Sequence, residues 1–166
     1  AAPFHLWKDT AGEGATTAPA IVKLPNQTQA QAIHHGFASV LDVFPTVLEY
    51  ANIAVPQGQY KGRQINTPSG YSWKSVLENK AQLIRPAQFS FADELHGSKY
   101  ARQGDWKIAL QGKAELGTGT WELYNLNNDR GETKNLAQDN PTKVQELIEV
   151  YNKYTQQNGV KEYNIQ

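Results

Sequence analysis

The chain contains no cysteine and no methionine among its 166 residues, and its 16 basic side chains are balanced by 16 acidic ones. The absence of cysteine excludes disulfide bridges, thiolate metal sites, iron–sulfur clusters and a cysteine nucleophile within these residues. The zero net charge argues against broad electrostatic attraction to nucleic acid or to an anionic membrane. No apolar run approaches the roughly 20 residues of a membrane-spanning helix. We therefore expect a globular chain that binds neither nucleic acid nor a membrane.

The first half of the chain predicts a strand followed by a helix. A short, β-branched apolar stretch closed by proline predicts a strand, buried on most sides, over residues 18–25. Apolar residues then recur at helical spacing and predict a helix over 43–51. Asp42 is its expected N-cap, which places Pro45 in the first turn, where a missing amide hydrogen costs nothing. Asn52 is expected to take the left-handed exit from this helix.

Two further stretches lead to a predicted boundary. Prolines and glycines surround every short apolar group over 53–70, which indicates an extended surface connection. Ser72 is expected to cap a short helix over 73–77. The sequence pattern changes near residue 88, where we place a domain boundary.

The second half predicts an antiparallel sheet and a long helix. Short alternating stretches separated by turn residues predict a meander of about four strands, at 89–92, 99–102, 106–110 and 121–126. Asn140-Pro141 starts an amphipathic helix over about 141–157 that ends at Gly159. An amphipathic helix beside such a sheet is expected to cover one of its faces. The predicted fold class is therefore α+β, with domains at 1–88 and 89–166.

No complete catalytic set stands out from the residues alone. The adjacent His34 and His35 diverge in either secondary structure, and His96 precedes a glycine in a predicted turn, so solvated or structural roles are favoured for all three. The neighbouring carboxylates of Asp93 and Glu94 point apart on a strand and do not converge on one bond. The tryptophans and tyrosines lie mostly at core positions. Lys8, on a glycine-bearing loop, can bring an ammonium to an anionic oxygen, although a solvated lysine is the plainer interpretation.

The order of these segments resembles the type I sulfatases, members of the alkaline-phosphatase-like superfamily, and bacterial arylsulfatases most of all. The matching segments run through nearly the whole chain, and they are Leu6-Trp7-Lys8, Gly12-Glu13-Gly14-Ala15, Asp42 to Ala51 (compare D-x-x-P-T-L-L-x-x-A-G), Gly62-Arg63, Ser69 to Trp73, Arg102 to Lys107 (compare R-x-G-D-W-K), Trp121 to Leu126 and Asn135-Leu136-Ala137. The chain departs from the family pattern at Ala15, Asn52, Asn125 and Arg130.

The resemblance implies a C-terminal portion of a sulfatase. Residues 1–88 would be the tail of the α/β catalytic domain, and residues 89–166 the C-terminal subdomain. The family hydrolyses sulfate esters with a formylglycine made from a C/S-x-P-x-R motif and with a calcium ion, and this chain holds neither that motif nor a cysteine. Both cofactors would belong to the parent enzyme, together with an N-terminal catalytic domain as partner. The chain alone is expected to be inactive, and the resemblance makes Lys8 its one sulfate-binding residue.

Two alternatives remain open from the sequence. A free-standing binding or assembly module would use the sheet and its aromatics, begin near residue 1 in its gene and unfold cooperatively alone. A phosphatase or phosphonate hydrolase of the same superfamily would also carry its active-site ligands upstream. The sulfatase interpretation predicts an exposed apolar face at Ile21, where the rest of a large sheet would pack.

Overall fold

The computed structural model describes residues 2–25, 33–113 and 116–161 and separates the chain into two compact units. One unit comprises Ala1–Lys23 and Gln88–Gln166, and the other comprises Leu24–Ala87. The break at residue 88 lies where the sequence pattern changes. Residues 1–23 pack with the second half of the chain, whereas the sequence-based domain assignment groups 1–88 together; that assignment concerns the parent protein and stays a prediction.

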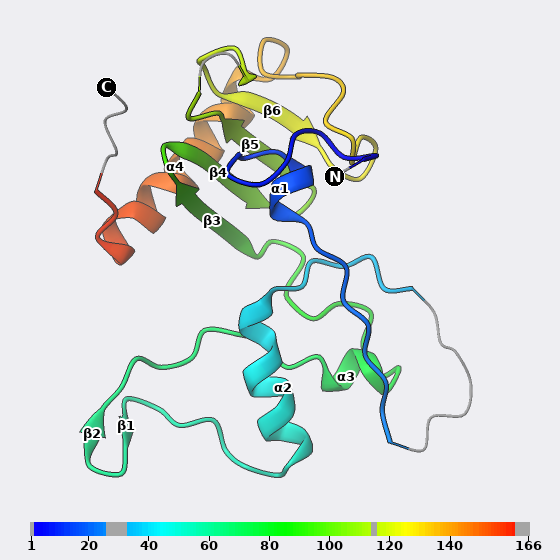
Figure 1. Cartoon of the computed structure of the whole chain (residues 1–166), viewed down its shortest axis with the longest axis vertical. Coiled ribbons are helices and arrows are strands. Elements are labelled where there is room, and N and C mark those ends of the chain that lie inside the picture. The colour runs from blue at the N-terminus through cyan, green and yellow to red at the C-terminus, as the bar shows by residue number, and fades with distance from the viewer. Residues whose placement is uncertain (1, 26–32, 114–115, 162–166) are drawn as a thin grey trace. The chain divides into compact units, whose positions relative to one another are not determined.

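The first unit is built on a four-stranded antiparallel sheet (Figure 1). Its strands follow one another in chain order, and they are β3 (Ser90–Leu95), β4 (Ser98–Gln103), β5 (Trp106–Leu110) and β6 (Glu122–Asn125). The turn between β3 and β4 consists of His96 and Gly97, which both have positive φ, at 51° and 81°. That is the backbone shape that favours a tight two-residue hairpin. The predicted meander is confirmed.

Helix α4 (Pro141–Asn158) packs on one face of this sheet. Proline stands at its first turn, and Gly159 ends it in the left-handed conformation at φ 62°, as the sequence predicts. Its apolar stripe meets Ala92, Ala101, Ile108 and Leu123 of the four strands through the buried Leu147 and Tyr151. The α+β fold class is therefore confirmed. None of the helices in the described ranges is long and apolar enough to cross a membrane.

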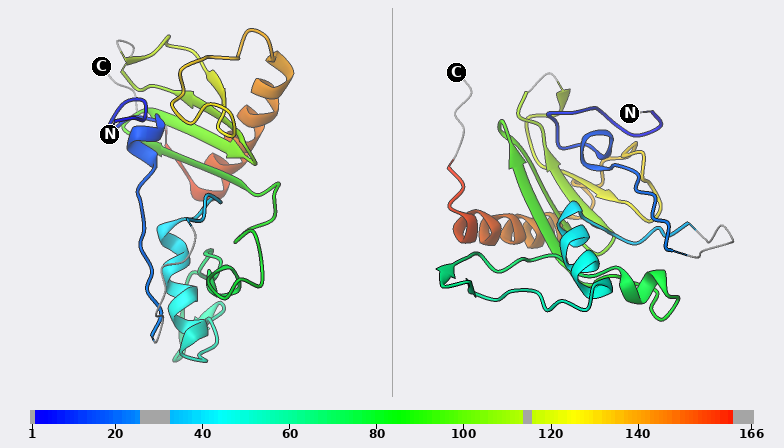
Figure 2. Two further views of the ribbon diagram at one scale, coloured as in Figure 1. Left: turned by 90° about the vertical axis from the view of Figure 1, so that its right-hand side faces the viewer. Right: turned by 60° about the horizontal axis from the view of Figure 1, so that its bottom comes forward.

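The opposite face of the sheet carries the N-terminal segment with the short helix α1 (Glu13–Thr16), so the sheet separates α1 from α4 (Figure 2). A second small core lies on this face, formed by Ala11 with Ala109, Tyr124 and Leu126. The strands alternate between the two faces: Ile108 points toward α4, while its neighbours Lys107 and Ala109 face the N-terminal segment.

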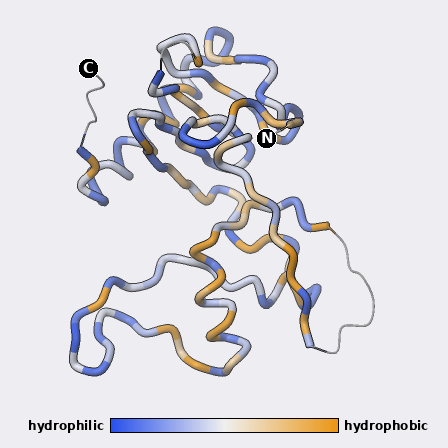
Figure 3. Tube along the Cα trace, in the orientation of Figure 1, coloured by the Kyte–Doolittle hydropathy of each residue, from blue (hydrophilic) through white to orange (hydrophobic). Residues whose placement is uncertain are grey.

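The second unit contains helix α2 (Val43–Tyr50) after a 3₁₀ turn, η1 (Val40–Asp42). Asn52 leaves α2 at φ 56°, which confirms the predicted exit. The carboxylate of Asp42 does not cap α2, because it receives hydrogen bonds from other parts of the unit. The hydropathy colouring of Figure 3 shows α2 as largely apolar, and Phe44 and Val47 are 49% and 59% exposed.

Two short elements complete this unit. Helix α3 (Lys74–Leu77) begins one residue later than predicted, with the Ser72 hydroxyl accepting from the Lys74 amide at 3.1 Å. The predicted extended connection contains a small hairpin that the sequence analysis missed, β1 (Gln59–Tyr60) and β2 (Arg63–Gln64).

The predicted strand over residues 18–25 is wrong for this chain. These residues form neither helix nor strand, and Ile21 is 98% exposed. A strand needs a hydrogen-bonding neighbour, and no described residue pairs with this stretch. Ile21 is exposed, as the sulfatase interpretation expects, but it does not lie on a strand.

Candidate functional site

Lys8 is exposed in a tight turn that begins the first unit. Leu6 and Asp9 flank the turn with left-handed backbones, at φ 61° and 67°. The Thr10 hydroxyl donates to the Trp7 carbonyl at 2.6 Å and closes the turn. A left-handed residue other than glycine costs of the order of 1–2 kcal/mol, so this shape persists only because surrounding contacts impose it.

Those contacts come from side chains of the sheet and its following loops. The Ser98 hydroxyl donates to the Asp9 carbonyl at 3.1 Å. The amide of Ala11 donates to Gln111 Oε1 at 2.9 Å. Asp9 and Ala11, alternate residues of the segment after Lys8, are thus hydrogen-bonded to a side chain of β4 and to the side chain that follows β5.

A third contact fixes the far end of the same segment. The amide of Glu13 donates to Glu132 Oε2 at 2.7 Å, and the Gly14 amide donates to the His5 carbonyl at 2.8 Å. An added Cβ on Gly12 would lie 2.6 Å from that same carbonyl oxygen, so a glycine is required at this close approach. We call residues 9–13 the strap.

A buried ion cluster lies under the strap. The ammonium of Lys107, which is 1% exposed, is 2.8 Å from Glu13 Oε1 and 2.9 Å from Glu132 Oε1. Burial by itself would raise the pKa of Glu13, but the charge and hydrogen bond of Lys107, with a hydrogen bond from Thr17, hold this pKa below its ordinary value. The cluster is therefore a paired, charged network that joins the strap to β5.

The sheet explains why these groups meet. Lys107, Ala109 and Gln111 alternate along and just beyond β5, so they share the face that carries the strap. Glu132 reaches the same face from the loop after β6, and the Thr16 hydroxyl from α1 completes the environment of Lys107 at 3.3 Å.

The histidines form no metal centre in the described residues, where no group of three or more His, Cys, Asp or Glu side chains could hold an ion. His34 and His35 are exposed, and His96 lies in the β3–β4 turn, as predicted. His5 differs from the other three histidines because it lies beside the buried ion cluster, with its Nδ1 3.8 Å from Glu132 Oε2.

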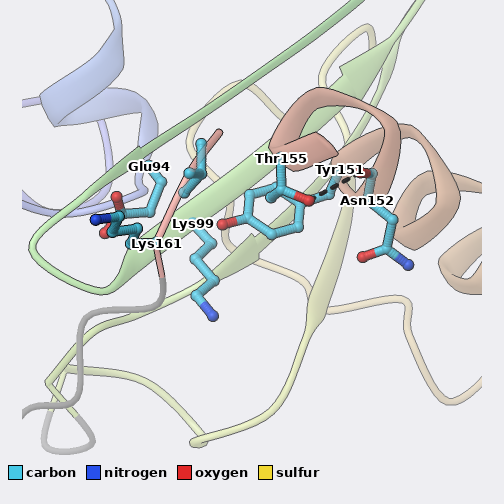
Figure 4. A pocket seen from close by; sticks show the side chains of 7 residues that line it. Glu94, Lys99, Tyr151, Asn152, Thr155 and Lys161 are labelled. Atoms are coloured by element: carbon cyan, nitrogen blue, oxygen red, sulfur yellow. Dashed lines mark hydrogen bonds between the residues drawn. The ribbon is translucent and has the colours of Figure 1, made fainter. Parts of the chain in front are cut away.

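A small hollow lies beside α4 (Figure 4). Its volume is 110 Å³, well below the roughly 300–1,000 Å³ of ordinary ligand pockets. The lining is mixed polar and apolar, from Glu94, Lys99, Tyr151, Asn152, Thr155, Val160 and Lys161. Its size does not suit a sulfated sugar or an aryl ester.

The family pattern marks Lys8 but not the residues that hold the segment after it. The structure brings Ser98, Gln111 and Glu132 to the strap. No local signal marks Lys107 as buried, because it alternates with Trp106 and Ile108 and so lies on the opposite face of the strand, which becomes buried only when the N-terminal segment covers it.

Comparison with known proteins gives a consistent result. No family model matches the chain. The chain is 34% identical over 159 residues to an uncharacterized sulfatase of Schizosaccharomyces pombe, covering 96% of this chain and 28% of that protein. It is 27% identical over 158 residues to a sulfatase of Formosa agariphila, covering 84% of this chain and 26% of that protein. The chain therefore spans about a quarter of the length of these relatives.

Solved structures share the fold. A chain from Bacteroides thetaiotaomicron, BT33336S-sulf, described with that organism's metabolism of multiple glycosaminoglycans, aligns with a TM-score of 0.52 at 21% identity, over 69% of this chain and 24% of that one. BT4656, solved with its substrate D-glucosamine-2-N,6-O-disulfate, aligns with a TM-score of 0.50 at 21% identity, over 75% of this chain and 25% of that one. Since a yeast protein is among the relatives, the likeness is not confined to bacteria. The chain belongs to the sulfatase family, in which it represents a C-terminal portion of its longer relatives.

Proposed function

We propose that the protein to which this chain belongs hydrolyses sulfate esters, and that Lys8 contacts the sulfate group of the substrate. The likeness to two named sulfatases along nearly the whole chain is the observation that carries this proposal. The geometry of Lys8 supports its part: the side chain is exposed, while the residues after it are tied to buried groups.

The overall reaction breaks the bond between sulfur and the ester oxygen. Water supplies the oxygen that sulfate gains and the proton that the leaving alcohol or phenol takes up. A positioned ammonium at a non-bridging sulfate oxygen stabilises the bound anion, and it accelerates the reaction only where its interaction strengthens in the transition state. Lys8 supplies a compact positive charge for that contact.

We further propose an arylsulfatase activity with formylglycine and calcium as the cofactors of the whole protein. The residues that the structure describes do not fit either group: no acidic or histidine cluster among them suits a metal ion, and the sequence has no C/S-x-P-x-R motif in which formylglycine could form. We therefore derive no step through either cofactor, and the contribution of this chain is the anion contact of Lys8.

The test replaces Lys8 in the full-length protein that carries this chain. Lys8→Ala is expected to lower kcat/KM for 4-nitrophenyl sulfate more than about tenfold, equivalent to about 1.4 kcal/mol of transition-state stabilisation. Lys153, exposed on α4, offers the matched control, and Lys153→Ala should leave kcat/KM unchanged. The unsubstituted protein should also prefer the sulfate ester to 4-nitrophenyl phosphate. Equal activity of Lys8→Ala and the unsubstituted protein would remove Lys8 from the site, and preference for the phosphate would replace the sulfatase by a phosphatase.

A further inference from the structure

We propose that Ser98 and Gln111 are positioning residues that hold Lys8 in place through the strap, an inference that rests on the proposed function of Lys8. Neither side chain touches Lys8. Each one binds a backbone group of the segment that follows Lys8, and each is buried, at 5% exposure.

Ser98 acts through a hydrogen-bond relay. The amide of Gly112 donates to the Ser98 Oγ at 3.1 Å, which leaves the hydroxyl hydrogen to donate to the Asp9 carbonyl. A Cβ on Gly112 would lie 2.6 Å from the His96 carbonyl oxygen, so the backbone that supplies the relay is closely packed. Asp9 follows Lys8 directly, so the relay fixes the residue next to the lysine in its left-handed conformation.

Gln111 holds the strap two residues further along. Its Oε1 accepts from the Ala11 amide, and Ala11 is itself 1% exposed. An added Cβ on Gly117 would lie 2.8 Å from Gln111 Cγ, so the backbone of the following loop packs directly on this side chain. The glutamine therefore has little freedom to move away from the strap.

The ion cluster fixes the end of the strap. Glu132 accepts from the Glu13 amide while it binds the Lys107 ammonium, so the last residue of the strap is attached to β5. These charged groups support the fold of the unit. They are poor sites for a test by substitution, because removal of one member leaves a buried charge unpaired and can unfold the unit.

The arrangement matters because a lysine side chain is long and flexible. The positions that its ammonium can reach depend on where the backbone places the Cα of the lysine. A displacement of about 1 Å in a catalytic group can cost roughly 10²-fold in rate. A backbone fixed on one side by Ser98 and Gln111 restricts the positions that the Lys8 ammonium can reach. We therefore expect both residues to affect the reaction only while Lys8 is present.

A double-mutant cycle tests this in the full-length protein with 4-nitrophenyl sulfate. Ser98→Ala removes the hydroxyl, and Gln111→Met removes the amide oxygen at similar length. We expect each to lower kcat/KM about three- to tenfold, and to change it less than about twofold when Lys8 is already alanine, because coupled sites are not additive. A purely structural loss would lower kcat/KM by the same factor in the protein with Lys8 and in the Lys8→Ala variant.

The outcomes separate the two proposals. If Lys8→Ala alone has no effect, the proposed role of Lys8 fails. The positioning inference fails if Lys8→Ala is impaired but the Ser98 and Gln111 substitutions lower kcat/KM by the same factor with and without Lys8. It also fails if these two substitutions leave kcat/KM unchanged in both proteins. Tyr154→Phe is the matched control, because it removes one hydroxyl hydrogen bond, 3.0 Å to Asp93, at the α4 contact. It should leave kcat/KM unchanged. If Gln111→Met does not fold, Ser98→Ala decides the question alone.

Discussion

The carboxylate of Asp42 is fully buried in the second unit. It accepts hydrogen bonds from the backbone amides of Ser39 and Tyr71 at 2.8 Å and from the Trp73 indole at 3.1 Å, and it is paired with the Arg85 guanidinium. Burial alone would raise the pKa of Asp42, but the hydrogen bonds, that of Arg85 foremost, outweigh it and hold the pKa below its ordinary value.

The lowered pKa of Asp42 predicts that the second unit loses stability at low pH. A carboxyl whose pKa is lower in the folded than in the unfolded chain stabilises the fold above its unfolded pKa of about 4, and this stabilisation is lost as the pH falls through the folded value. Asp42→Asn should lower the free energy of unfolding by about 3–5 kcal/mol at pH 7, because it leaves Arg85 buried without its ion pair. Urea unfolding of both proteins between pH 7 and pH 3 measures this. The difference should shrink toward acid, and a difference independent of pH would contradict the assignment.

Single residues also mark the limit of sequence-based prediction at the site. Lys8 could be selected because the family pattern places it. The partners of Lys107 could not, since Glu13 lies 94 residues away along the chain and no local pattern relates the two. The chemistry of Lys107 demanded a carboxylate, but only the folded sheet determines which one supplies it.

Helix α4 is the element that sequence alone predicted best. Its bounds depend on local chemistry, with proline in the first turn, an apolar stripe at helical spacing and a glycine exit. Trp121 meets the buried Tyr151 edge-on at a centroid distance of 5.5 Å, so these aromatics serve the core as expected.

The packing of α4 gives a prediction for the whole first unit. Leu147 has no exposed surface and packs within the cluster formed by the strands and Tyr151. Leu147→Ala should lower the free energy of unfolding by about 2–5 kcal/mol, through lost apolar contact and the cavity left behind. Gln145→Ala, exposed on the same helix, should change it by less than about 0.5 kcal/mol. Thermal or urea unfolding compares the two. Similar losses for both variants would mean that Leu147 is not part of the core.

The strand predicted over 18–25 is absent because a strand, unlike α4, does not depend on local chemistry alone. Its β-branched apolar residues have the composition of a buried strand, but a strand depends on a neighbour that can lie anywhere in a protein. Helices α2 and α4 satisfy their own backbone groups and so can be predicted from local sequence. The stretch around Ile21 needs partners that the described residues do not supply.

At the scale of the molecule, the order of the matching segments carried more information than any one of them. Composition and periodicity led only to an α+β chain with an exposed lysine. The ordered set led to the sulfatase family, which the comparisons then showed along 96% of the chain. The match corresponds to about a quarter of the relatives' length, and the proposed sulfate-ester hydrolysis assigns its nucleophile to residues outside this stretch.

The last prediction concerns the 166 residues on their own. They should not hydrolyse 4-nitrophenyl sulfate, because an ammonium such as Lys8 can bind an anion but cannot attack sulfur while protonated, and no C/S-x-P-x-R motif supplies the family's nucleophile. The measurement is release of 4-nitrophenol by the purified chain, with the full-length protein as the positive control. Lys8→Ala, made in the same chain, separates true turnover from a contaminant. Hydrolysis that disappears with this substitution would show that the chain carries a complete site of its own, and would require a nucleophile other than the one that the family uses.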